Sequence, residues 1–217
     1  MRSCLGGRAR NEWGVNNPVL LALLTVAGVY VGKLWLDDVR AARRDAPNPN
    51  AFPGATDAPG RAYAIAVAGA VGLVAVETWL EARLGLAAQQ TRMTWLAALY
   101  SIAGAPIIEE LIFRGWIVVQ ARGRVVMWVA AVGASAGFAV LHPFLWRWDE
   151  AGFALTPTAK GWFSTAAIFA GSVWFYAARL GPWNPSRSLG PCFAAHAAKN
   201  AAVVATKGVL GFVAGAW

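Results

Sequence analysis

Five side chains that could act together in hydrolysis lie within apolar segments of this 217-residue chain. They are two adjacent acids, the only two histidines and one carboxamide, namely Glu109, Glu110, His142, His196 and Asn200. A carboxylate and an imidazole can share the proton of an attacking water, while a second imidazole and a carboxamide donate hydrogen bonds to the oxygen that becomes negative. An ionisable group at the centre of a span costs about 2.5–3.5 kcal/mol on insertion scales, so such residues are functional by default. The pattern predicts a buried hydrolytic site.

Helical spacing groups these residues further. Glu110 and Arg114 are four residues apart with the acid first, which is the favourable order for an ion pair on one helix face. Glu109 lies about 100° away around the same helix. The four-residue spacing recurs in two later pairs, Phe138 with His142 and His196 with Asn200. We expect the three helices that carry these residues to face one another.

Three motifs built on these residues resemble those of a known family. They are Glu109-Glu110-Leu-Ile-Phe-Arg114 (EExxxR), Phe138-Ala-Val-Leu-His142 (FxxxH) and His196-Ala-Ala-Lys-Asn200 (HxxxN). In this order, and in adjacent apolar segments, they are similar to the signature of the CaaX prenyl protease and bacteriocin-processing (Abi) family of intramembrane glutamic endopeptidases. The resemblance covers the second half of the chain.

The resemblance implies a role for each residue. Glu109 and His142 would activate the water, and His196 with Asn200 would stabilise the oxyanion. Glu110, paired with Arg114, would hold the geometry of the site. The resemblance favours a glutamic mechanism without a metal or other cofactor. The implied reaction is hydrolysis of a peptide bond near the C-terminus of a membrane-associated protein or peptide.

Two alternatives remain open at this point. Two histidines and two glutamates could bind a divalent ion such as zinc with an open position for water, although no HExxH motif is present. A non-enzymatic membrane carrier or immunity protein could use the same polar cluster to bind an ion or a peptide. A serine protease is not favoured, because Ser101, Ser135 and Ser172 all lie outside any Gly-x-Ser-x-Gly sequence.

The amino-acid composition indicates that this chain lies in a lipid bilayer. Hydrophobic residues make up 58% of the sequence, which is too apolar for an ordinary soluble domain. Lys and Arg outnumber Asp and Glu by 19 to 11, but the basic residues fall between apolar runs, as anchors at a headgroup surface do, and predict no nucleic-acid partner. Twelve tryptophans suit a membrane interface. We expect an integral membrane protein, located in a bacterial inner (plasma) membrane.

The sequence predicts an all-α, polytopic transmembrane helix bundle of about six spans. The expected spans are residues 18–36, 62–80, 93–120 with a kink at Pro106, 125–145, 162–178 and 193–216. We expect the active site between the third, fourth and sixth spans. Residues 37–61 are interpreted as an extended loop, and no strand-like alternation is evident. Small residues over 130–137 predict that the fourth helix is central.

The chain is interpreted as a single transmembrane domain over residues 1–217. Residues 1–92 would hold N-terminal spans and a loop of unassigned role, and residues 93–217 the catalytic core. Arg2, Arg8 and Arg10 precede the first apolar run, which lacks a small-x-small cleavage site. We therefore expect a retained first span rather than a cleaved secretory signal.

Overall fold

The computed structural model describes residues 17–149 and 151–217, and over these residues it is mostly helical. The N-terminal arm with Arg2, Arg8 and Arg10 lies outside the described residues. In chain order the elements are α1 (Pro18–Arg43), α2 (Gly60–Arg83), the short η1 (Ala87–Gln89), α3 (Trp95–Ala103), α4 (Ala105–Glu110), η2 (Leu111–Trp116), α5 (Gly123–Leu141), β1 (Trp146–Asp149), β2 (Gly152–Leu155), α6 (Ala159–Leu180) and α7 (Gly190–Val209).

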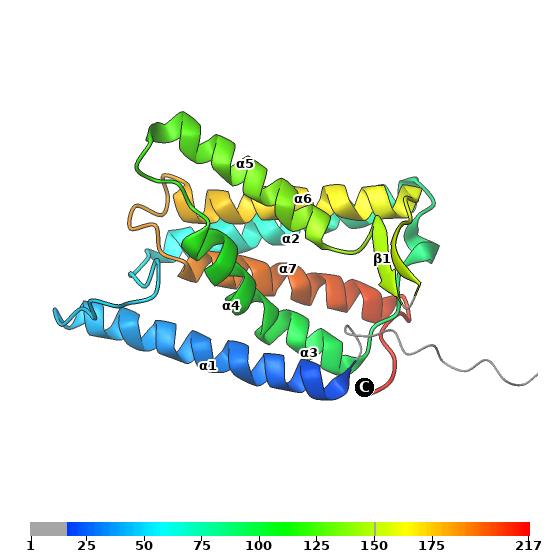
Figure 1. Ribbon diagram of the computed structural model, residues 1–217, viewed down its shortest axis with the longest axis horizontal. Coiled ribbons are helices and arrows are strands. Elements are labelled where there is room, and N and C mark those ends of the chain that lie inside the picture. Colours follow the sequence, from blue (N-terminus) through cyan, green and yellow to red (C-terminus); the bar gives the residue numbers. More distant parts are fainter. Residues whose placement is uncertain (1–16, 150) are drawn as a thin grey trace, which may run out of the picture.

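The helices form a bundle in which α7 holds the central place (Figure 1). Helix α7 packs against α2, α3, α4 and α6, while α1 covers α3 and α4 on one side and α5 lies on α6 at the other. The prediction that the fourth span, now α5, is central is wrong. Helix α5 packs against α6 through one face, where Ala131 and Ser135 are buried, whereas a side chain at Gly133 or Gly137 would meet nothing within 4 Å.

Four helical segments are long and apolar enough to cross a membrane, namely Pro18–Arg43, Gly60–Arg83, Trp95–Trp116 and Gly123–Leu141. Large apolar side chains on their outer faces are exposed, as lipid-facing positions require; Val26 is 68% exposed and Val129 67%. The expected bundle is thus confirmed for four spans. Helices α6 and α7, with 22 and 20 residues, are not among these four segments.

The first helix is longer than predicted, because it continues through residues assigned to the loop. Asp37 forms ion pairs with Lys33 at 2.5 Å and with Arg40 at 3.0 Å, at the spacings that stabilise an exposed helix face. The loop therefore starts after Arg43 rather than at residue 37. It is fixed by Asp57, whose carboxylate accepts from Arg43 at 2.5 Å, and this bond lowers the pKa of Asp57.

The third segment is interrupted where the sequence predicted a kink. Helix α3 ends at Ala103, and α4 restarts around Gly104 and Pro106, because proline lacks the N–H that would continue the helical bonding. The segment ends at Trp116 rather than at residue 120. Its last six residues form a π-helical turn, η2.

The fourth helix is shorter than predicted and is followed by strands. Helix α5 ends at Leu141, and His142 has extended backbone angles (φ −75°, ψ 127°). Strands β1 and β2 then form an antiparallel hairpin, so the prediction of a chain without strands is wrong. Strands of four residues are too short for an alternating pattern to be recognised in the sequence. The last helix was predicted over residues 193–216. It is observed as α7 from Gly190 to Val209, so it begins earlier and is shorter.

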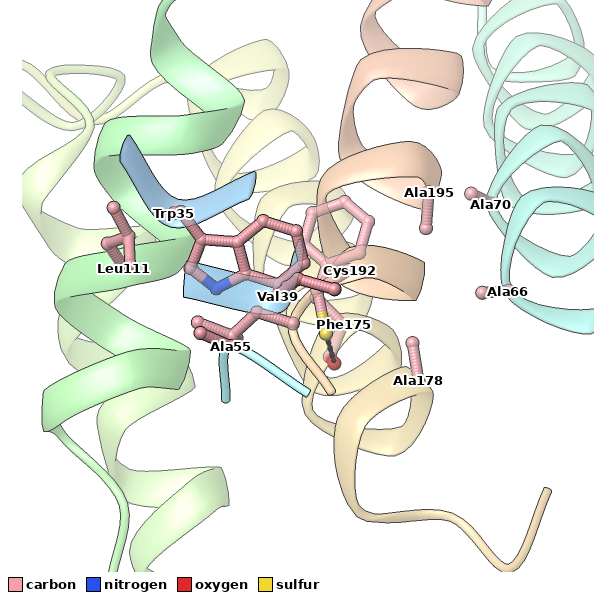
Figure 2. Packing of buried hydrophobic residues seen from close by; sticks show 11 residues of the cluster. Trp35, Val39, Ala55, Ala66, Ala70, Leu111, Phe175, Ala178, Cys192 and Ala195 are labelled. Atoms are coloured by element: carbon pink, nitrogen blue, oxygen red, sulfur yellow. Dashed lines mark hydrogen bonds between the residues drawn. The ribbon is translucent and has the colours of Figure 1, made fainter. Parts of the chain in front are cut away.

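Small side chains pack the centre of the bundle (Figure 2). Ala66 and Ala70 on α2 lie against α7, where Ala195 is fully buried. Because apolar side chains gain little from burial in lipid, close backbone contact through small residues holds such helices together. Trp35 from α1 completes this core and packs edge-to-face on Phe193, with 5.0 Å between ring centroids.

The crossing of α1 with the α3–α4 junction offers a test of this packing. A Cβ atom on Gly28 would lie 2.7 Å from the backbone of Gly104. We expect Gly28→Ala to destabilise the protein by about 1–3 kcal/mol, because the added methyl group must push two backbones apart. Gly72→Ala on α2 is the matched control, since a side chain there meets nothing within 4 Å. Thermal unfolding in detergent measures both; equal midpoints for the two variants would contradict the close crossing.

Candidate active site

Glu109 and Glu110 are the last two residues of α4, immediately before the π-helical turn η2. Tyr176 of α6 bonds to the backbone of this turn. Its hydroxyl oxygen lies 2.6 Å from the carbonyl oxygen of Phe113 and 3.0 Å from that of Ile117, and the two carbonyls share its single proton. Such π-turns are rare and often occur at functional sites, because they redirect side chains without ending the helix. Here the turn follows directly on the two acids.

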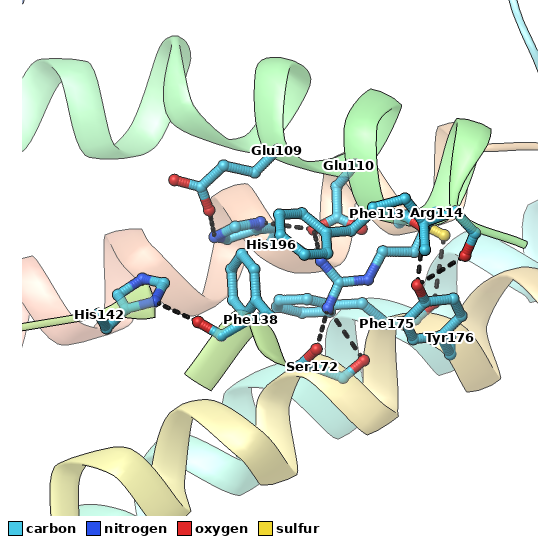
Figure 3. Close-up of polar contacts among 12 residues, drawn as sticks. Glu109, Glu110, Phe113, Arg114, Phe138, His142, Ser172, Phe175, Tyr176 and His196 are labelled. Atoms are coloured by element: carbon cyan, nitrogen blue, oxygen red, sulfur yellow. Dashed lines mark hydrogen bonds and ion pairs between the residues drawn. The ribbon is translucent and has the colours of Figure 1, made fainter. Parts of the chain in front are cut away.

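Glu110 is the centre of the buried polar contacts (Figure 3). Its Oε1 atom accepts from Nη1 of Arg114 at 3.1 Å and from Nδ1 of His196 at 2.7 Å. The side chains of Glu110 and Arg114 are both fully buried. Since an ionised carboxylate only accepts, Nδ1 of His196 carries a proton and Nε2 points away from Glu110. That Nε2 atom faces Glu109, whose Oε2 is 3.8 Å away.

Arg114 lies in a cage of aromatic rings, which accounts for a guanidinium in an apolar bundle. Its Cζ atom is 4.8 Å from the ring centre of Phe138, 5.0 Å from that of Tyr176 and 5.3 Å from that of Phe175. Its Nη2 atom donates to both the carbonyl (3.1 Å) and the hydroxyl of Ser172. Cation–π contacts are worth up to about 2 kcal/mol each when desolvated, so the cage stabilises a charge that lipid would not.

His142 reaches the cluster through aromatic contacts. Its Nδ1 atom lies 2.8 Å from the carbonyl oxygen of Phe138, and the two rings pack at 4.7 Å. A carbonyl only accepts, so in the neutral ring Nδ1 is protonated and Nε2 has a free lone pair. Figure 3 shows His142 and Glu109 toward the same end of the site, away from Tyr176. No hydrogen bond joins His142 to Glu109 within the described residues.

Asn200 lies one turn of α7 beyond His196, but it bonds a different helix. Its Nδ2 atom donates to the carbonyl oxygen of Ser101 on α3 at 2.6 Å. Over the part of the chain that is described, Asn200 forms no hydrogen bond with the other predicted site residues. The structure therefore joins Glu109, Glu110, Arg114 and His196 by polar contacts, places His142 against them through Phe138, and fixes Asn200 to α3.

Sequence reasoning missed the contribution of α6. Ser172, Phe175 and Tyr176 all contact the buried pair of Glu110 and Arg114 or its supporting turn, and Phe175 also stacks on His196 at 4.6 Å. Their spacing of three and four residues placed them on one helix face, but serine and aromatic residues are common in spans and gave no functional signal. Within 17–149 and 151–217, no three His, Cys, Asp or Glu side chains are grouped to hold a metal ion.

Ionisable side chains that bond to one another within an apolar helix bundle indicate a functional site in a membrane protein. A comparison with protein-family models matches residues 91–202 to the family described as Type II CAAX prenyl endopeptidase Rce1-like. The match covers just over half of the chain and includes all three motifs. The chain belongs to this family and is an integral membrane protease of the glutamic type, so the resemblance predicted from the motifs is confirmed. Comparisons with curated proteins and with solved structures gave no match.

Proposed function

We propose that this protein is an endopeptidase that cuts a membrane-associated protein or peptide near its C-terminus at the Glu109 cluster. The observation that carries the proposal is the unbroken set of contacts from Glu109 through His196 and Glu110 to Arg114. A buried ion pair is costly unless further hydrogen bonds complete it, and here His196 and Ser172 supply them. These contacts fix the buried residues in place and position the proposed catalytic carboxylate, Glu109, at their edge.

In the proposed reaction, a water binds between the Glu109 carboxylate and Nε2 of His142. One of these groups takes a proton as the water oxygen attacks the carbonyl carbon of the scissile peptide bond. The resulting oxyanion accepts hydrogen bonds from His196 and from the amide of Asn200. The C–N bond then breaks, and the proton passes to the leaving amine. Donation by Nε2 of His196 requires a proton on both ring nitrogens, because Nδ1 donates to Glu110.

We also infer that α6 and α7 cross the bilayer with the other helices, which gives the six spans expected from the sequence. Their polar side chains face protein rather than lipid: Arg179 and Lys199 are 3% and 5% exposed. A charged side chain is tolerated at membrane depth when it is paired within the bundle. A bacterial plasma membrane is the proposed location.

Proteomics of protein C-termini tests the proposal and identifies a substrate. Cells that produce the wild-type protein are compared with cells that produce the Glu109→Gln variant at equal abundance. We expect one or a few membrane-associated proteins to lose a short C-terminal segment only in the wild-type cells. Identical C-termini in the two samples would contradict the proposed endopeptidase.

Chelation distinguishes the metal-free mechanism from its alternative. Since the proposed reaction uses only side chains and water, we expect cleavage by the purified protein to stay within about twofold of its rate after EDTA or 1,10-phenanthroline treatment. A zinc-dependent peptidase, in contrast, would lose its activity, because the metal activates the attacking water. Loss of cleavage on chelation, followed by recovery with added zinc, would overturn the metal-free mechanism.

A further inference from the structure

A cavity of about 470 Å³ lies at the end of the bundle where the β1–β2 hairpin is drawn in Figure 1. The C-terminal parts of α2 and α7 and the N-terminal part of α6 line it, together with the η1 loop and the turn after His142. Apolar side chains of Val74, Ile168 and Val203 cover part of its wall. The cavity therefore offers both apolar surface and the polar groups of several helix ends.

The charged side chains of the cavity do not balance. They are Lys160, Lys199, Lys207, Glu77 and Glu81. Lys199 pairs with Glu77 at 3.1 Å, and Lys160 pairs with Glu81. Among the described residues Lys207 has no acidic partner and donates instead to the carbonyl (2.6 Å) and hydroxyl (3.2 Å) oxygens of Thr91. One positive charge is in excess, so the cavity attracts an anionic group.

The cavity and the candidate active site are connected by neighbouring residues. Lys199 follows His196 by three residues on α7, and Asn200 is its neighbour. Phe144, another lining residue, stacks on His142 with ring centroids 6.0 Å apart. Two lining residues, Lys199 and Phe144, are thus neighbours of candidate site residues.

Helix geometry sets the distance between this cavity and the proposed reaction. Lys199 and Lys207 lie three and eleven residues beyond His196, which is about 4.5 and 16 Å along α7 at about 1.5 Å per residue. An extended peptide advances about 3.3 Å per residue. An anionic group held between these lysines would therefore lie within about five residues of a bond that is cut at His196.

We propose that the cavity binds the C-terminal carboxylate of the peptide substrate, with Lys207 as its main donor. An ammonium group has three N–H donors, and Lys207 uses only two on Thr91, so the third can bond a carboxylate oxygen. The apolar wall receives the side chains next to that terminus. The inference rests on the proposed endopeptidase function, and it explains how the protein would select bonds near a C-terminus.

Two fluorescent peptides test this site. Both carry a prenylated cysteine followed by three apolar residues; one ends in a free acid and the other in an amide. Binding is measured to the Glu109→Gln protein, which should cut them at least about 100-fold more slowly than the wild type, in nanodiscs of neutral lipid. We expect the acid to bind about tenfold more tightly than the amide, the size expected for a charge-assisted hydrogen bond. Adding Lys207→Gln should remove this difference, whereas Lys33→Gln, at a 65% exposed side chain on α1, should preserve it.

Three outcomes would overturn the carboxylate site. One is equal binding of acid and amide to the Glu109→Gln protein, a comparison that does not depend on the folding of any lysine variant. Another is an acid preference that survives Lys207→Gln. The third is loss of the preference when phosphatidylglycerol is added to the nanodiscs, which would assign the cavity to lipid phosphate. Wild-type cleavage is scored separately: cutting without acid preference refutes this site alone, and acid preference without cutting supports the site but refutes the endopeptidase.

Discussion

Glu109→Gln is expected to lower the rate of peptide hydrolysis by about 100- to 10 000-fold, the contribution typical of a positioned acid or base. Glutamine has nearly the same shape as glutamate but cannot take a proton from water. Glu109 lies at the edge of the buried cluster, with its side chain 27% exposed and 3.8 Å from His196, so the fold should tolerate the change. Initial rates in proteoliposomes and unfolding midpoints in detergent measure the two effects separately.

Asp149→Asn is the matched control for this substitution. It makes the same change from acid to amide on the exposed strand β1, outside the candidate site. We expect wild-type hydrolysis from this variant. Full activity of Glu109→Gln would assign the proton transfer to another group, and equal losses in both variants would show that the assay responds to surface charge.

Arg114→Met is expected to destabilise the protein by about 3–5 kcal/mol, because it leaves the buried Glu110 carboxylate without its cation. Methionine keeps contact with the surrounding aromatic rings, so little of the loss should come from an empty space. Combining it with Glu110→Gln removes both charges, and we expect the double variant to be more stable than Arg114→Met alone. Unfolding midpoints and denaturant titrations of the single and double variants provide the measurement.

Arg124→Met controls for loss of an arginine in general, since Arg124 is exposed at the start of α5. It should unfold like the wild type. If Arg114→Met were as stable as Arg124→Met, the ion pair between Arg114 and Glu110 would not stabilise the protein. If the double variant were less stable than both single variants, the cost of the buried carboxylate would not be the cause.

The sequence predicted one contact of the candidate site but not the contacts between its helices. Pairing of Glu110 with Arg114 follows from helical spacing alone, and the structure contains that pair. The bond from His196 to Glu110 was not predicted, because it joins residues 86 positions apart on different helices. Spacing within one helix gives direction around its axis, but it does not say which helices meet.

For the fold, too, local features were predicted and the arrangement of helices in space was not. Apolar length predicted six spans, and four of them are confirmed as helices long and apolar enough to cross a membrane, since length and hydropathy are local properties. The central position of α7 was missed because its polar residues resembled a functional patch rather than a packing surface. The close approach of Gly28 to Gly104 and the aromatic cage of Arg114 depend on helix order in space. The hairpin after His142 was missed because strands of four residues carry little periodicity.

The most direct test of the central claim is to locate the cut made by the purified protein. Wild-type protein in neutral-lipid vesicles with EDTA receives the acid-terminated prenylated peptide, and mass spectrometry identifies the products. The comparison is His142→Gln, which keeps a donor for the Phe138 carbonyl but cannot accept the proton of water. A single cut within about five residues of the C-terminus by the wild type, and none by His142→Gln, is the predicted result. A cut that persists unchanged in His142→Gln, or no cut by folded wild-type protein, would contradict the account.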